Sequence, residues 1–334
     1  MILVSTFLKG IAVGLANIIP GVSGGTMLLL LGIYERVIRA LRNIGLDALR
    51  QLKDGRRGLV TALRQVDALF VGVLALGALF AVWRAAKVLL YLLDEHHDPT
   101  YGFFFGLVLL SVVVPYRMIK HKRASGALFC ALGVVAVVGL TFAIPGEQRL
   151  ASEQQKAAIK AAKAEAAKVG HKANLPDVEV DAAKLGLFFG SGAVAIAAMI
   201  LPGISGSFML LLMGVYFDLL AAITNLNLPL LGVFGLGCIF GLLTFTRLLS
   251  YLLERHHDPT MAFLLGLVGG SLWAIWPFKT FGMAGDTRVD LANALPTTLG
   301  TNEALTLVAA LAGCAIVAGF IWLETRMAPP PAER

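Results

Sequence analysis

Two apolar runs near the start of the chain are each too short to cross a bilayer and are separated by a loop of proline, glycine and hydroxyl residues. Residues 10–19 precede the loop and residues 27–34 follow it; the loop reads Pro20-Gly21-Val22-Ser23-Gly24-Gly25-Thr26. Because a helical span needs about 20 apolar residues, the break predicts a re-entrant hairpin over residues 3–34. Pro20 ends the first half-helix, and Ser23 is a favourable N-cap for the second.

The same loop occurs again, and a second block of sequence repeats with it. The second loop reads Pro202-Gly203-Ile204-Ser205-Gly206-Ser207, and the apolar run after it matches the run after the first. The other block is Tyr91–Thr100, which ends in His-His-Asp-Pro-Thr as Tyr251–Thr260 does. Two blocks repeated in the same order indicate an internal duplication.

Composition places the chain among membrane proteins. Of its 334 residues 57% are hydrophobic and 15% charged, which excludes an ordinary soluble domain. The formal net charge is +7, but the basic residues lie between apolar spans, a distribution typical of topology determinants rather than of a nucleic-acid surface. The three cysteines lie in apolar segments, so we expect no disulfide, no zinc site and no cofactor.

The hydrophobic pattern predicts an all-α polytopic membrane protein in two halves. We expect each half to hold one re-entrant hairpin and three spans, with a polar loop between the halves. The first repeat, 1–145, contains hairpin 3–34, an Arg-rich amphipathic helix at 35–66 and spans at 68–93, 101–119 and 124–145. The outer loop is 146–184, with a solvated helix from Ala151 to Val169, and the second repeat, 185–326, contains hairpin 186–216 and spans at 229–253, 260–278 and 303–323, before a disordered tail at 327–334.

Parity and charge predict the same topology. Three spans are an odd number, so the second half is expected to be inverted relative to the first. With both termini in the cytoplasm, the basic stretches 35–66 and 117–123 fall inside, and the links 94–99 and 217–228, which lack Lys and Arg, fall outside. An inverted repeat with broken helices is typical of secondary transporters, whose binding sites lie near the membrane midplane.

The two loops supply the first candidate site residues. Backbone amides at the start of each second half-helix, capped by a serine, favour an anion at mid-depth. We therefore expect one central site lined by Ser23, Gly24, Gly25, Thr26, Ser205, Gly206 and Ser207. The alternative is that these small residues serve only close helix packing.

Charged residues within or beside the apolar segments supply further candidates. Arg84 falls well inside its span, where a cation costs about 2.5–3.5 kcal/mol to insert, so we predict that it clamps a phosphate. Lys87 and Arg247 occupy matching positions and either bind the same group or extend to the interface. Glu35 and Asp218 follow the hairpins, as ion-coupling residues or as ordinary helix-end charges. The inverted topology places one His-His-Asp copy on each side of the membrane, so the four histidines cannot share one ion. We therefore expect interfacial loops rather than a metal site.

Three functional classes fit a membrane anion site to different degrees. A lipid-phosphate transporter would hold the headgroup between the half-helices and leave the tail in lipid. A channel or carrier for a small inorganic anion would use the same helix ends. An intramembrane phosphatase needs a His nucleophile among cationic residues, and neither loop is followed by His, so we do not expect an enzyme.

The motifs resemble the PopT family of polyprenyl-phosphate transporters. The resemblance rests on Ala16–Thr26, on Leu31–Glu35, and on Pro99, Phe103–Leu107, Ser111 and Pro115, with echoes at Pro202–Gly206, Pro259, Phe263, Gly266, Ser271 and Pro277. It implies return of undecaprenyl phosphate from the outer to the inner leaflet of the bacterial cytoplasmic membrane for envelope synthesis. It also adds Asn17 to the substrate-binding candidates. The Ala- and Lys-rich stretch at 151–172 departs from the family pattern.

The direction of transport implied by this resemblance predicts an energy source. A phosphate moving inward is opposed by an interior-negative potential, at about 2.3 kcal/mol per charge per 100 mV. We therefore expect coupling to protons or sodium ions. The expected partners are a polyprenyl-phosphate lipid, the coupling ion and membrane lipids, but not nucleic acid.

Overall fold

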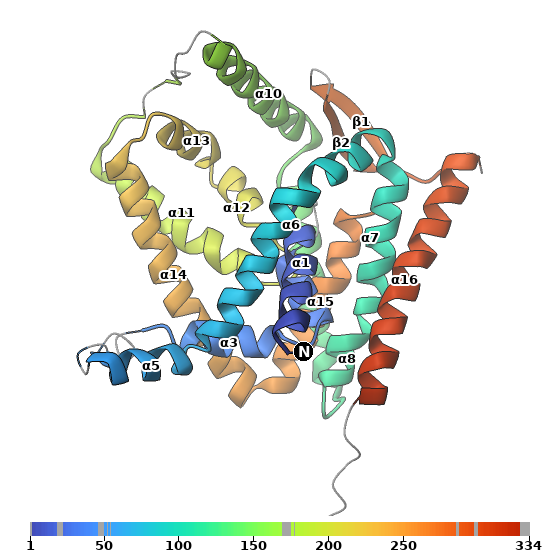
Figure 1. The fold of residues 1–334 in the computed structure, drawn as a ribbon. Coiled ribbons are helices and arrows are strands. Elements are labelled where there is room, and N and C mark those ends of the chain that lie inside the picture. The colour runs from blue at the N-terminus through green and yellow to red at the C-terminus, as the bar shows by residue number, and fades with distance from the viewer. Residues whose placement is uncertain are drawn as a thin grey trace, which may run out of the picture.

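A computed structural model describes residues 2–18, 23–45, 50–51, 53, 55–168, 175–176, 178–284, 287–296 and 300–327 (Figure 1). Pro20, Gly21 and Val22 lie outside these ranges. The first half is helical, and its elements are α1 (Ile2–Ile18), α2 (Gly24–Leu30), α3 (Tyr34–Arg42), α5 (Gly55–Gln65), α6 (Ala68–Glu95), α7 (His97–Ser111), α8 (Val113–Met118) and α9 (Ala124–Ala143).

The second half contains the same series of helices with one insertion of strands. A polar helix, α10 (Gly146–Lys168), joins the halves and contains residues 151–168 of the helix expected there, while Val169 lies outside the described residues. The elements that follow are α11 (Ala182–Ile200), α12 (Gly206–Leu212), α13 (Tyr216–Thr224), α14 (Leu228–Arg255), α15 (His257–Ala274), β1 (Lys279–Ala284), β2 (Thr287–Asn293) and α16 (Thr301–Met327).

Equivalent elements of the two halves make equivalent contacts. Helix α1 packs along α6 as α11 packs along α14. A methyl group on Gly10 would collide with the carbonyl of Leu74, and one on Gly192 with that of Phe234. The short helices α2 and α12 are both followed by a left-handed glycine, Gly32 at φ 65° and Gly214 at φ 71°. These matches support the internal duplication at the level of packing.

The last long helix of each half packs against the other half. Helix α16 lies along α7 (Figure 1), and α9 lies along α15. Both contacts are close because glycines face carbonyls: Gly106 abuts Ala310, and Gly266 abuts Cys130. Each half therefore packs its last long helix against the other half, and the two halves have one hydrophobic core in common. Met261, Leu264 and Leu267 of α15 are fully buried in that core, beside Tyr34 of α3.

The repeated His-His-Asp-Pro-Thr block makes a tight turn between long helices. Only His96 separates α6 from α7, and only His256 separates α14 from α15. The hydroxyl of Thr100 donates to the carbonyls of His96 and Leu92, and Thr260 makes the same pair of contacts with His256 and Leu252. The interfacial loops expected at the two copies are thus reduced to a single residue each, because Thr100 and Thr260 bond back to the preceding helix.

Three predictions about local structure were wrong. Strands Lys279–Ala284 and Thr287–Asn293 pair in antiparallel fashion and are called the hairpin below, so the chain is not entirely helical. The amphipathic helix expected over 35–66 is interrupted, since Asn43–Gly45 follow the end of α3 and α5 starts only at Gly55. The link 217–228 contains most of α13. The hairpin follows from alternation in β2, where Val289 is buried and Arg288 and Asp290 share the other face.

The described residues include five helices long and apolar enough to cross a membrane. They cover His97–Met118, Ala124–Ala143, Ala182–Ile200, Leu228–Arg255 and Thr301–Trp322. Two bent pairs would raise the number to seven, namely Gly55–Gln65 with Ala68–Arg84 and Gly206–Leu212 with Tyr216–Thr224. The chain is therefore a multi-pass helical membrane protein. At 19 residues, α11 is longer than the half-helix expected in the second hairpin.

Candidate functional site

The first motif loop leads directly into α2. Ser23 has an extended backbone and caps the helix, accepting a hydrogen bond from the Gly25 amide at 3.2 Å, as its sequence position predicts. The Gly24 amide donates to Oδ1 of Asn17, at the end of α1, over 3.0 Å. Free amides were expected at this helix start. Instead, side chains of Ser23 and Asn17 occupy two of them.

The two motif loops meet. The Ser23 hydroxyl donates to the carbonyl of Leu201 at 3.2 Å, and the Gly203 amide donates to the hydroxyl of Thr26 at 3.1 Å. Ser23 and Thr26 are both buried. Just beyond, the Tyr34 hydroxyl donates to the carbonyl of Ile200. Residues about 180 positions apart thus form one polar seam inside the protein.

Glycine is required where the loops approach each other. A Cβ on Gly25 would lie 2.9 Å from the carbonyl oxygen of Ile200, and one on Gly24 would lie 2.7 Å from the Asn17 amide group. Gly203 has φ 78°, and a Cβ there would lie 2.7 Å from the Leu267 carbonyl oxygen. The glycines of the motif therefore allow contact between the two loops as well as exposing backbone.

The second loop is not an exact copy of the first. Ser205 precedes α12 but makes no side-chain cap, and its hydroxyl lies 3.0 Å from that of Ser207. Both residues are exposed. Gly206 packs against Met199, which occupies the position of Asn17 in the first half. The described residues of the first loop use their polar groups in contacts within the protein, whereas the second loop presents two exposed hydroxyls.

The candidate cations are spread over different regions. Arg84 is exposed on α6, with its guanidinium 5.2 Å from the centroid of the Trp83 ring. Gly14 of α1 contacts Ala78 of α6, so Arg84 lies about 9 Å further along α6, near the level where α1 ends. Arg247 lies beside Gly45 at the far end of α3 and donates to the carbonyl of Leu243. The side chain of Lys87 lies outside the described part.

The two candidate carboxylates have different partners. Oε1 of Glu35, in the first turn of α3, lies 3.4 Å from Nε2 of His257. Asp218 is paired with Lys184 of α11 at 2.5 Å. That pair lines an open pocket of about 710 Å³ between α10, α11 and α13. Glu35 therefore contacts an imidazole, and Asp218 contacts an ammonium group.

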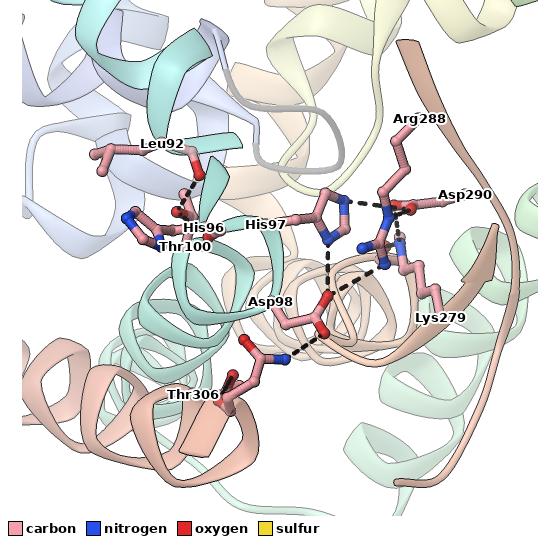
Figure 2. A network of polar contacts seen from close by, with 11 residues as sticks. Leu92, His96, His97, Asp98, Thr100, Lys279, Arg288, Asp290 and Thr306 are labelled. Atoms are coloured by element: carbon pink, nitrogen blue, oxygen red, sulfur yellow. Dashed lines mark hydrogen bonds and ion pairs between the residues drawn. The ribbon is translucent and has the colours of Figure 1, made fainter. Parts of the chain in front are cut away.

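A network of charged groups surrounds the first His-His-Asp copy (Figure 2). Nδ1 of His97 lies 3.0 Å from Oδ1 of Asp98, and Nε2 lies 3.2 Å from Oδ1 of Asp290 on β2. Arg288 joins the two carboxylates, and Lys279 of β1 approaches Asp290 at 3.4 Å. The other oxygen of Asp98 accepts from Asn302 at the start of α16. The network ties α7 to the hairpin and to α16.

The second copy holds elements of the first half. Nδ1 of His257 lies 3.3 Å from Oδ1 of Asp258, and Nε2 faces Glu35. Asp258 also accepts from the backbone amides of Lys120 and His121, each at 2.9 Å. Each copy of the block thus binds to segments of the opposite half.

The hairpin charges influence one another. Burial alone would raise the pKa of Asp290, but the His97 ring 3.2 Å away and the charges of Lys279 and Arg288 hold it below its usual value. Burial lowers the pKa of Lys279, against the opposing attraction of Asp290. Asp290 is therefore ionised over the physiological range, at the centre of the network.

His97 and His257 were not among the candidate site residues predicted from the sequence. Both were assigned to interfacial loops, although their repetition was visible. Asp290 and Lys279 lie in a hairpin that no sequence motif predicted. Only the alternation of apolar and polar residues over 287–293 could have indicated it. Among the described residues no group of three or more His, Cys, Asp or Glu side chains has metal-binding geometry.

The fold and the joined motif loops define a class: duplicated, multi-pass helical membrane proteins with a polar seam in their core. A model of the undecaprenyl phosphate translocase-like family, described as VCA0040-like, matches residues 13–289. The chain belongs to this family, which confirms the resemblance noted in the sequence.

Two relatives carry the same descriptive name. A polyprenyl-phosphate transporter of Vibrio cholerae serotype O1 is 37% identical over 275 residues, covering 82% of this chain and 78% of the relative. A polyprenyl-phosphate transporter of Staphylococcus aureus is 31% identical over 277 residues, covering 81% and 85%. No solved structure matches the chain.

Proposed function

We propose that this protein transports polyprenyl phosphate, returning undecaprenyl phosphate from the outer to the inner leaflet of the bacterial cytoplasmic membrane for envelope synthesis. Family membership and the names of the two relatives support the substrate class. The observation that carries the proposal to a site is the contact between the motif loops, through Ser23 with Leu201 and Thr26 with Gly203. Transport of an intact lipid needs no chemical step, so no catalytic residue is assigned.

The proposed topology is an inverted repeat of two re-entrant hairpins with three spans each. Helices α6 and α14, which correspond in the duplication, run in opposite directions, which supports the inversion (Figure 1). The start of α1, the Arg-rich helices α3 and α5, and α8 lie toward the same end of the molecule, which supports a cytoplasmic assignment for that end. The hairpin β1–β2 and α10 then face outward.

In this proposal the phosphate binds where the loops join and the prenyl tail remains in lipid. The hydroxyls of Ser205 and Ser207 are exposed and suit phosphate oxygens as hydrogen-bond donors. Asn17, Ser23, Gly24, Gly25, Thr26 and Gly206 shape the seam. The Arg84 side chain is exposed on the surface of α6 near the level of the first loop, where a headgroup entering from lipid can reach it. Lys87 lies about one turn further along the same helix. Arg247 lies at the cytoplasmic end and suits the departing headgroup.

Inward movement of the anion requires an energy source, for which we propose cation coupling. Glu35 is the better candidate of the two carboxylates, because its contact is the titratable His257. Asp218 is neutralised by Lys184. A proton fits the Glu35 contact better than a sodium ion, since an imidazole nitrogen is not a typical sodium ligand.

Reconstitution into vesicles tests the function. Labelled undecaprenyl phosphate is placed in one leaflet, and its appearance in the other is measured with and without the protein. The expected result is protein-dependent transfer that falls in the double variant Ser205→Ala and Ser207→Ala. Gly186→Ala on α11 is a matched control, because a methyl group there meets open space. Transfer of inorganic phosphate but not of the lipid would instead support a small-anion carrier.

A further inference from the structure

Both ring nitrogens of His97 face carboxylate oxygens. Nδ1 lies 3.0 Å from Asp98 and Nε2 lies 3.2 Å from Asp290, with the ring between them (Figure 2). The side chain is largely buried, at 11% exposure. A neutral imidazole has one N–H and one lone pair, whereas the imidazolium ion has two N–H donors. Only the protonated ring presents an N–H group toward both carboxylates at once, in a hydrogen bond with Asp98 and an ion-pair contact with Asp290.

The second copy repeats the arrangement atom for atom. Nδ1 of His257 faces Asp258 at 3.3 Å, and Nε2 faces Glu35 at 3.4 Å. In both copies Nδ1 takes the aspartate that follows in sequence and Nε2 takes a carboxylate from the opposite half. The two sites lie at opposite ends, because α6 joins α7 near the hairpin and α14 joins α15 at the end that holds α3 (Figure 1).

We propose that His97 and His257 are two proton-binding sites that latch the halves together, one at each membrane face. The proposal rests on the proposed transport function for its physiological role, which is to regulate access to the central seam from each side. A proton on the imidazole of His97 joins α7 to the hairpin, and a proton on that of His257 joins α15 to α3. Loss of that proton turns one donor into a lone pair that faces a carboxylate, so the latch weakens.

The other charges at the outer latch come from three elements. Asp98 lies on α7 itself. The hairpin contributes Asp290, Arg288 and Lys279, and the Tyr101 ring stacks on the imidazole with centroids 4.5 Å apart. Arg149 of α10 also acts on the hairpin charges. The two carboxylates contact the ring directly, and the cations contact the carboxylates, so direct contacts favour the imidazolium.

The charges at the inner latch come from α15 itself, from α3 and α14, and from the segment after α8. Glu35 and Asp258 contact the ring. The side chain of His121 lies 3.4 Å from Asp258. On the neighbouring faces of α3 and α14, Arg42 bonds to Glu254 and Ser250. Within the described residues, the carboxylates are again the groups that touch the imidazole.

Histidine NMR tests proton binding without any transport assay. Purified protein with ¹⁵N-labelled histidine is titrated from about pH 6 to about pH 9, and resonances are assigned with His97→Gln and His257→Gln. The expected result is two rings that carry protons on both nitrogens at neutral pH. Neutral rings at pH 7 for both residues would overturn the proposal.

Hydrogen exchange tests the latch. Protection of the hairpin is expected to fall severalfold as the pH rises through the same range, after correction for intrinsic exchange rates. In His97→Gln the hairpin should be poorly protected throughout, whereas α3 should be affected only in His257→Gln. His96→Gln is a matched control, because its ring points away from the carboxylates (Figure 2). Hairpin protection that is independent of pH in the unmodified protein would contradict the latch.

Transport separates this inference from the proposed function. In vesicles, His97→Gln and His257→Gln are expected to change the pH profile of lipid transfer, while His96→Gln and His256→Gln keep it. If the unmodified protein moves no polyprenyl phosphate but the NMR and exchange results hold, the proposed function fails and the proton sites stand. If transfer occurs and all four variants share one pH profile, the regulatory role is wrong.

Discussion

The hydroxyl of Thr26 accepts a hydrogen bond from the Gly203 amide at 3.1 Å and so links the two copies of the duplicated loop. Thr26→Val keeps the shape but removes the acceptor, which leaves a partly buried amide unsatisfied at a cost of about 1–3 kcal/mol. We expect a lower Tm in detergent and reduced lipid transfer. Thr26→Ser restores the hydroxyl and should recover both. Full activity of the valine variant would show that the link is dispensable.

Helix packing across the halves gives a second prediction. Gly266→Ala places a methyl group against the Cys130 carbonyl and should destabilise the protein by about 1–3 kcal/mol through overpacking. Gly269→Ala lies on the same helix, but its methyl group meets open space. Thermal unfolding should therefore separate the two variants, with only the first losing stability. Equal Tm values would argue against the close α9–α15 contact.

Arg84 gives a third prediction. If it holds the phosphate, Arg84→Ala should lower lipid transfer by at least about tenfold, since a charge-assisted hydrogen bond contributes about 1.5–3 kcal/mol. Arg84→Lys should recover only part of the activity, because a planar guanidinium can hold two phosphate oxygens. Arg57→Ala removes another exposed cation, on α5, and should have no effect. Unchanged transfer in Arg84→Ala would remove this residue from the site.

Acid, like alkali, should weaken the contacts that hold the hairpin β1–β2. The Asp290 pKa is below its usual value, so ionisation of this carboxylate contributes stability above about pH 4 that is lost as the pH falls through the folded-state value. Hairpin protection against hydrogen exchange should therefore fall below about pH 4. In Asp290→Asn this acid-dependent loss should disappear, with lower protection at neutral pH. An unchanged acid transition in the variant would assign it to another group.

The sequence predicted what depends on local chemistry. Ser23 and the glycines predicted the broken helix, and the repeated blocks indicated the duplication. The sequence could not predict contacts between distant segments. Whether the Gly24 amide meets a ligand or Asn17 depends on how α1 and α2 fold back on each other. Similarly, the sequence around Asp290 does not show that the hairpin places this carboxylate beside His97, almost 200 residues earlier in the chain.

The exchange of final helices between the halves has a consequence for biogenesis. The glycine face of α7, at Gly102 and Gly106, is covered by Thr306, Ala310 and Gly313 of α16. Helix α16 follows α7 by almost 200 residues, so this face meets lipid or the insertion machinery while the intervening residues are made. Two half-length chains expressed together should assemble, while either alone should be degraded. Membrane quality control would thus recognise a truncated product by the groove on α7.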